Sequence, residues 1–318
     1  MTDEHRRSGR SGRSTVARVE PVPGEPAATA TVGAERALLV ADYHAGYEAG
    51  LRYERGVDVP SHAPERRDRL GSLLERTDPD RLVVCGDLMH SIGDPGGAER
   101  GELEVLFEGF PPSLDVTVVK GNHDGGIETW LGADDGPESP SAFEPGSETD
   151  LEIGSVTIVS GDGIALGQGE DDRDGHGDDT RDGERNGHGD RTVGVCHGHT
   201  WPAPAALECD VLCLGHEHPC VRLEDEVGGS RVERAWLRGR LDPTPFRDRA
   251  AYEGLSWLED STVEPPRIVV LPAFNDLVGG TWVNVPNQSF LSPFLPAGIA
   301  DGEAYLLDGT RLGPYESI

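Results

Sequence analysis

Short apolar runs that end in polar residues recur along the first half of the chain. Three of these runs are predicted to be buried strands, at residues 36–42, 81–86 and 115–121. Helices are predicted beside them, at residues 45–56, 64–76 and 99–109. Pro64 favours the second helix, because proline fits the first turn of a helix. The alternation of strands and helices indicates βαβ units and a mostly parallel sheet.

The pattern changes after residue 150, where apolar runs follow one another with few helical segments between them. Six further strands are predicted, at residues 151–160, 192–196, 210–214, 219–223, 231–237 and 267–271. A second sheet is therefore expected. The 43 Gly and 24 Pro residues agree with a fold that has many loops and few long helices.

Two segments lack the apolar residues that a packed core needs. Residues 1–18 are rich in Arg, Ser and Gly, and we predict a disordered tail there, with nucleic-acid contact as the alternative. Residues 162–192 are acidic and are predicted to be a disordered loop insertion. His176 and His188 lie in its GHGD repeats, which we interpret as solvated loop rather than as a weak metal site. Residues 19–318 are expected to form a single domain around this insertion.

The chain is strongly acidic, with a net charge of -30, and Lys120 is its one lysine. The insertion at 162–192 holds ten Asp/Glu and four Arg, so most of the negative charge lies elsewhere. We interpret this charge as a halophilic surface, since dense carboxylates keep a protein hydrated in a salt-rich cytoplasm. A specific acidic function is the alternative.

The cysteines and the hydropathy of the chain indicate the cellular compartment of the protein. The five cysteines, an odd number without a CxxC pair, are expected to be reduced and mostly buried. No window of 18 apolar residues is present, so no membrane span is expected. The N-terminus is basic but has no apolar stretch, so it does not match a secretory signal. These features favour a cytoplasmic protein.

Five predicted strands end in polar residues that suit metal binding. The strand ends are Asp42-Tyr43-His44, Gly86-Asp87-Leu88-Met89-His90, Gly121-Asn122-His123-Asp124, His197-Gly198-His199 and Gly215-His216-Glu217-His218. In open α/β sheets ligands bind at the carboxyl ends of the strands. A D-x-H or H-x-H spacing places alternate side chains of an extended segment on one side, where a pair can hold one metal. One such motif alone would fit a turn, but five in one chain indicate a site.

The donor types narrow the choice of metal. Carboxylate, amide and imidazole groups are present, with no thiolate in register. This set favours Mn, Fe, Zn or Co over a sulfur-ligated zinc site, and it holds too many histidines for a Ca or Mg cage.

In order and spacing, these motifs resemble the calcineurin-type metallophosphoesterase superfamily. The superfamily pattern is D-x-H, GD, GNH[DE], a lone His and GH-x-H, and here it is DYH, GDLMH, GNHD, HGH and GHEH across residues 38–218. The chain is also similar to a narrower group, the archaeal SbcD-related (ICC-like) phosphoesterases. That similarity lies in ADYHAGYEAGLRYERGVDVP, CHGHTWP, LGHEHP and the tail LPAFNDLVGGTWVN. The resemblance implies an α/β fold, a four-layer α/β/β/α sandwich of two mixed sheets with the metals at one end.

The resemblance also implies roles for individual residues around two divalent metal ions, most often Mn. The first metal would be held by Asp42, His44, Asp87 and His218. Asp87 would bridge to the second metal, whose other ligands would be Asn122, His197 and His216. His123 would act on the substrate, with Asp124 orienting it. His90 and His199 are additional histidines, for which we expect a contact with the ligands or with the substrate.

The expected activity is hydrolysis of a phosphodiester bond by a hydroxide that bridges two metals. A nuclease related to DNA repair is the first hypothesis, and an enzyme for small phosphoesters such as cyclic nucleotides is the second. A metal-binding scaffold without catalysis is the third, disfavoured because the expected ligands and His123 are all present. The partner is then a phosphate-ester substrate, which includes nucleic acid, and no membrane is involved. The oligomeric state stays open.

Overall fold

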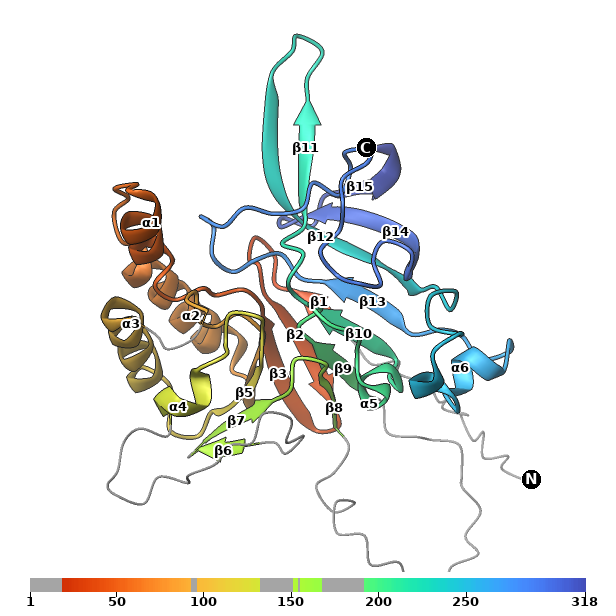
Figure 1. Cartoon of the computed structure of the whole chain (residues 1–318), viewed down its shortest axis with the longest axis horizontal. Helices are drawn as coiled ribbons and strands as arrows, with labels where there is room; N and C mark the ends of the chain where they lie inside the picture. Colours follow the sequence, from red (N-terminus) through yellow and green to blue (C-terminus); the bar gives the residue numbers. More distant parts are fainter. Residues whose placement is uncertain (1–18, 93–95, 132–150, 154, 168–191) are drawn as a thin grey trace, which may run out of the picture.

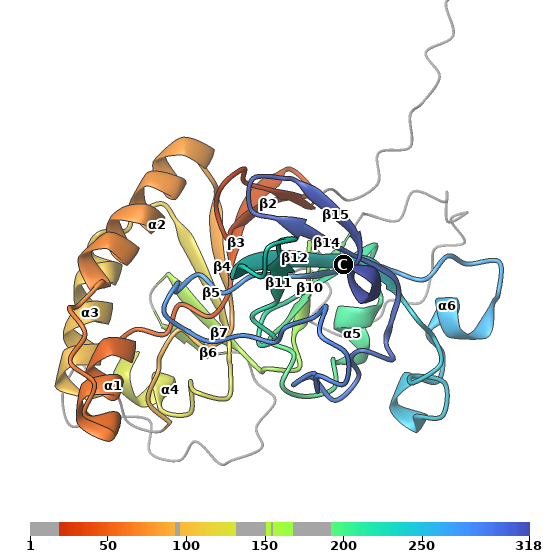
Figure 2. The ribbon, with the colours of Figure 1, turned by 90° about the horizontal axis from the view of Figure 1, so that it is seen from above.

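The computed structural model describes residues 19–92, 96–131, 151–153, 155–167 and 192–318. Two mixed β-sheets pack face to face, and helices flank the pair (Figures 1 and 2). The mixed α/β class with two mixed sheets, predicted from the sequence, is confirmed.

The first sheet has the order β1-β2-β3-β4-β5-β7-β6. Its strands are β1 (Val19–Pro21), β2 (Ala28–Val32), β3 (Glu35–Val40), β4 (Arg81–Cys85), β5 (Asp115–Val119), β6 (Leu151–Ile153) and β7 (Val156–Val159). The four strands β3, β4, β5 and β7 run parallel, while β1, β2 and β6 pair antiparallel at the two edges. The apolar runs predicted to be buried parallel strands therefore form the centre of this sheet.

The second sheet has the order β15-β14-β12-β13-β10-β9-β8, and β11 pairs with β12 beside this path. Its strands are β8 (Ile164–Leu166), β9 (Val193–Cys196), β10 (Val211–Leu214), β11 (Cys220–Glu224), β12 (Ser230–Leu241), β13 (Arg267–Val270), β14 (Ile299–Leu306) and β15 (Arg311–Pro314). Strands β9, β10 and β13 are parallel, and the other pairings are antiparallel. In Figure 1 the β11–β12 hairpin extends away from the rest of the molecule.

Helices cover the outer faces of the sheets unequally. On the first sheet lie α1 (Tyr47–Arg55), α2 (Ala63–Thr77), α3 (Gly97–Glu108) and α4 (Ile127–Leu131). On the second sheet the helices are short, α5 (Pro204–Leu207) and α6 (Ser256–Glu259), with 3-10 turns at Ala250–Tyr252 and Tyr315–Ser317. The fourth layer of the expected sandwich therefore consists of short helices and loops.

Three apolar clusters hold these layers together. One lies between the first sheet and its helices, and includes Leu38, Leu73 and Leu103. The cluster between the sheets joins side chains such as Leu39 and Val195, which are fully buried. The third cluster lies under the short helices. Each central strand contributes to two clusters, which explains why its sequence is apolar at consecutive positions.

Several sequence predictions need correction. The start of the predicted disordered insertion is wrong, because Ile164–Leu166 forms β8 and pairs with β9. Residues 151–160 form two antiparallel strands rather than one. Strands β1, β2, β14 and β15 were not predicted. The tail at 1–18 and residues 168–191, with His176 and His188, lie outside the described residues.

The cysteines in the described residues are all free, as predicted, and only Cys209 is partly exposed. Burial raises the pKa of the Cys85 and Cys196 thiols well above the ordinary range, so these thiols stay protonated. In the part of the chain that the structure describes, no helix has both the length and the apolar character needed to cross a bilayer.

Candidate metal centre

The polar ends of the central strands of both sheets meet at one edge of the molecule. Backbone hydrogen bonds join them: the Asp42 N–H donates to the carbonyl of Gly86, and the His44 N–H donates to that of Asp87. Five metal-ligand candidates have positive φ angles, namely Asp42 (56°), His44 (50°), Asp87 (50°), His216 (67°) and His218 (44°). Residues other than glycine seldom adopt this left-handed conformation, and it concentrates at functional sites.

Asp42, His44 and His218 form the first group of ligand atoms, which lie within 4.8 Å of one another. His218 Nε2 is 3.2 Å from Asp42 Oδ1. The Nδ1–H of His218 donates to the carbonyl of Gly279 at 2.8 Å. This bond leaves Nε2 as the lone-pair nitrogen that can bind a cation.

Asp87, His197 and His216 form the second group, again within 4.8 Å. Asp87 Oδ2 lies 3.5 Å from His197 Nε2 and 3.7 Å from His44 Nε2, so this carboxylate stands between the two groups. His197 Nδ1 donates to the carbonyl of Cys85 at 3.0 Å, which directs Nε2 toward the site. Asn122 Oδ1 is 3.2 Å from the same Nε2 and completes the second group.

The charge states suit cation binding. Burial lowers the pKa of His44 to about 3 and that of His216 to about 4, so both imidazoles are neutral at neutral pH. Burial would raise the pKa values of Asp42 and Asp87, but neighbouring histidines outweigh it and hold both below the ordinary value. The carboxylates are therefore ionised where a cation would sit.

Burial would lower the pKa of His197 and His218, but the neighbouring carboxylates outweigh it, so the pKa of His197 is raised to about 9 and that of His218 lies above its ordinary value. A cation bound at His197 would therefore displace a proton from its ring.

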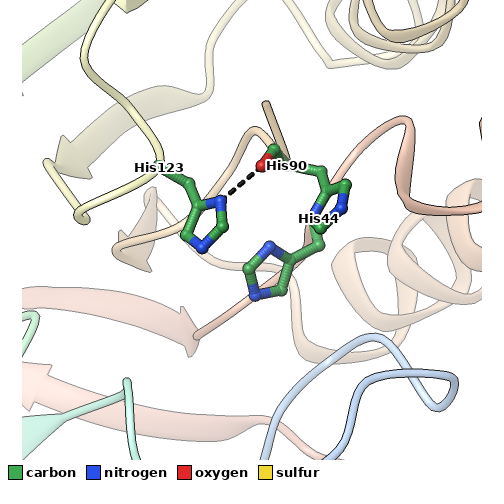
Figure 3. A group of neighbouring side chains, drawn as sticks. All are labelled: His44, His90 and His123. Atoms are coloured by element: carbon green, nitrogen blue, oxygen red, sulfur yellow. Dashed lines mark hydrogen bonds between the residues drawn. The ribbon is translucent and has the colours of Figure 1, made fainter. Parts of the chain in front are cut away.

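His123 lies beside the first group, and together with His44 and His90 it forms a third group whose ring nitrogens lie within 4.8 Å of one another (Figure 3). Its Nδ1–H donates to the carbonyl of His90, and its backbone N–H donates to Asp87 Oδ1 at 2.9 Å. The His90 ring stacks on the His123 ring with centroids 5.4 Å apart. These contacts hold the His123 ring through its Nδ1 side.

Asp124 bonds to backbone groups of the neighbouring loops. Its buried carboxylate accepts the backbone N–H groups of Leu88, Met89 and Gly121, at 3.3, 2.9 and 2.8 Å. Burial raises the pKa of Asp124 to about 6. The His90 carbonyl holds the His123 ring, while Asp124 ties the Asp87 loop to the Asn122 loop, so an orienting effect of Asp124 on His123 would act through these loops and stays a prediction.

The additional histidines both lie at the site. His90 has its ring centroid 5.5 Å from that of His44 and 4.8 Å from that of Tyr47. The ring centroid of His199 lies 5.1 Å from that of His197, a ligand candidate of the second group. Burial lowers the pKa of both residues, so both are neutral at neutral pH.

Two buried residues that support the site were missed by the sequence analysis. Glu217, inside the GHEH motif, accepts hydrogen bonds from Thr281 Oγ1 (2.9 Å) and from the Ser292 N–H (2.6 Å). Asn275 donates from Nδ2 to the carbonyls of Tyr43 and His44 at 3.3 and 3.4 Å. The only sign of these two residues in the sequence was their position in or near the recognised motifs. Their contacts could not be predicted, because they form only when residues 275–292 fold back onto the site.

Asn275→Leu is expected to weaken cation binding about 10–100-fold, because the loop that carries Asp42 and His44 loses its anchor. Calorimetric titration of metal-free protein with Mn²⁺ measures this change. Asn284→Leu is the matched control, since Asn284 makes comparable backbone bonds to Arg222. Equal Mn²⁺ affinity in Asn275→Leu and wild type would refute the anchoring role.

Glycines allow the loops to approach this closely. A Cβ at Gly86, whose φ is +88°, would lie 2.0 Å from His197 Nδ1, and one at Gly121 would lie 2.0 Å from Asp87 Oδ1. Side chains of the two groups therefore occupy the space that any larger residue would need.

Gly86→Ala is expected to lower the free energy of unfolding by about 3–5 kcal/mol and to displace His197. Gly24→Ala is the matched control, because Gly24 has φ +81° but nothing within 4 Å of the added Cβ. The control measures only the backbone strain of an alanine at positive φ, which is expected to lower the free energy of unfolding by about 1–2 kcal/mol. Chemical denaturation measures both variants, and equal losses in the two would contradict a steric role for His197.

The donor set fits divalent cations. Both ring nitrogens of His44 and Nε2 of His218 are buried without a hydrogen-bond partner in the described part of the chain. Buried polar atoms seldom lack partners, and a metal would satisfy one nitrogen of each ring. Two neighbouring groups of carboxylate and imidazole can hold cations that polarise a phosphate ester.

Comparisons with known proteins agree with this chemistry. The family profile described as Calcineurin-like phosphoesterase matches residues 36–220, which is more than half of the chain. No curated protein sequence matches the chain. Among solved structures, the Pseudomonas putida nuclease MPE has a TM-score of 0.43 and 16% identity, covering 93% of this chain and 100% of the nuclease chain. Members of the matched family use two divalent metals and hydrolyse phosphate esters. On the family match and the ligand groups that agree with it, the chain belongs to the calcineurin-like phosphoesterase family.

Proposed function

We propose that the protein is a phosphodiesterase that works with two divalent cations sharing Asp87. The observation that carries this proposal is the position of the Asp87 carboxylate, 3.7 Å from His44 Nε2 and 3.5 Å from His197 Nε2. One cation would be held by Asp42, His44, Asp87 and His218. The other would be held by Asp87, Asn122, His197 and His216.

Held by these residues, divalent cations would neutralise phosphoryl charge and lower the pKa of a bound water toward neutrality. His123 would supply a proton or hydrogen-bond donor, which the cations cannot. Its ring is fixed by the bond from Nδ1 to the His90 carbonyl, so Nε2 can donate a proton or hydrogen bond to the ester oxygens. Asp124 keeps His123 in place indirectly, because it ties the two loops together through backbone N–H groups.

Manganese is the metal we favour, with Fe, Zn and Co as alternatives, because the donors are oxygen and nitrogen. Within the family we place the chain in the archaeal SbcD-related group, on the motifs at residues 41–60 and 271–284. Residues 19–318 would form one domain. Its charge of -30 fits function in a salt-rich medium.

A nuclease with a role in DNA repair is the first candidate activity, and hydrolysis of small phosphodiesters is the second. The charge of -30 and the single lysine disfavour tight binding of duplex DNA, which relies on patches of Lys and Arg, and leave both single strands and small phosphodiesters as substrates. The two candidate activities would use the same metal chemistry and would differ in the substrate-binding surface around the metal centre.

A substrate panel with Mn²⁺ in high salt tests the proposal. It compares an aryl phosphodiester, an aryl phosphomonoester, cyclic nucleotides, and single- and double-stranded DNA. We expect diester cleavage that stops when EDTA is added and returns with Mn²⁺. Cleavage that persists in EDTA, or monoester cleavage alone, would refute the proposal.

A further inference from the structure

Residues 279–283 lie directly against the metal-ligand candidate His218. Gly279 accepts the His218 Nδ1–H, and a Cβ at Gly280 would lie 2.0 Å from the His218 carbonyl oxygen. The Thr281 carbonyl accepts the Cys220 N–H at 2.9 Å. This segment runs beside the start of β11 as a short parallel pairing in which Cys220 is the register partner of Trp282.

Trp282 is an exposed aromatic residue at this position. It exposes 38% of its surface, whereas Trp236 and Trp257 are buried. Because register partners direct their side chains to the same face, Trp282 shares a face with Cys220 and with Arg222, two residues further along β11. The guanidinium carbon of Arg222 lies 6.0 Å from the centroid of the Trp282 ring.

Arg222 is held in this position from two sides. Asn284 accepts its backbone N–H at 2.9 Å and donates to its carbonyl at 2.8 Å. Its guanidinium also pairs with Glu224 at 2.9 Å. An indole with an arginine over its face is a surface on which flat, electron-rich rings stack.

We propose that Trp282 and Arg222 form a subsite that stacks an unpaired nucleobase of a single-stranded nucleic acid whose phosphate lies at the metal centre. The proposal deepens the proposed function and rests on it for the position of the phosphate. A base inside a duplex has both faces covered by its neighbours, so the subsite selects single strands. Stacking is uncharged, which suits a protein whose charge of -30 repels polyanions.

Both residues lie beyond residue 220, where the match to the family profile ends. The subsite is therefore a feature of the C-terminal part of this chain and not of the shared metal centre. The subsite would select the substrate, while the metal centre would carry out the hydrolysis that is common to the family.

The test compares an oligothymidylate strand with an abasic strand that has the same phosphates and no bases. Binding to the full-length, Mn²⁺-loaded protein is measured by fluorescence anisotropy directly after mixing in high salt, and cleavage is measured later on gels. Wild type is expected to bind the oligothymidylate about tenfold more tightly than the abasic strand. Trp282→Ala should remove that preference, and Trp282→Phe should retain most of it.

Val227→Ala, at the 92% exposed tip of the same hairpin, is the control and should keep the full preference. Equal affinity of wild type for the two strands, an unchanged preference in Trp282→Ala, or equal affinity for duplex and single strand would overturn the subsite. Base-dependent binding without cleavage of any strand would leave the subsite standing and refute the proposed nuclease activity.

Discussion

Asp87→Asn is expected to lower kcat/KM by at least about 10³-fold and to reduce the occupancy of both cation positions. The substitution removes a carboxylate that lies between the two ligand groups, and an amide supplies neither its charge nor its second anionic oxygen. Metal analysis of the purified variant, together with turnover of an aryl phosphodiester, measures both effects.

Asp115→Asn is the control for Asp87→Asn. Asp115 is an exposed carboxylate at the start of β5, at the opposite end of the strand from the metal centre, and this variant should keep its metals and its activity. Full occupancy of both positions in Asp87→Asn would mean that Asp87 does not bridge them.

His123→Asn is expected to retain both metals and to lose about 10²–10⁴-fold in kcat. The reason is the geometry of the ring, which bonds through Nδ1 to the His90 carbonyl and is left out of both four-ligand sets proposed here. Asparagine cannot supply an Nε2 proton to the ester oxygens. Turnover and metal content are measured on the same sample.

His62→Asn is the matched control for His123→Asn, because His62 is a partly exposed histidine at the start of α2. It should match wild type in turnover and metal content. Loss of metal from His123→Asn would make His123 a ligand. Unchanged turnover in His123→Asn would show that His123 does not take part in catalysis.

The centre of the fold was predictable from the sequence because its strands are buried on both faces. Runs such as Leu82–Cys85 and Val211–Leu214 are apolar at every position, which no exposed segment requires. The edge strands gave no such signal. Strand β14 alternates buried and partly exposed positions and contains Asp301 and Gly302, and β1 has three residues.

The candidate metal ligands could be picked out in the sequence because each follows a buried strand. Their supporting contacts could not, since these depend on the C-terminal segment returning to the site. Phe274 donates its N–H to the Ala41 carbonyl, and Asn275 donates its N–H to that of Asp42, across more than 230 residues of chain. The backbone contacts of Asp124 could not be predicted for a similar reason, because its carboxylate accepts an amide of a loop 35 residues away in the sequence.

Anomalous diffraction from crystals of the Mn²⁺-loaded protein tests the shared carboxylate most directly. Two peaks about 3.5–4 Å apart are predicted, each within bonding distance of an Asp87 oxygen. A single peak, or two peaks of which one lies out of reach of Asp87, would contradict the account.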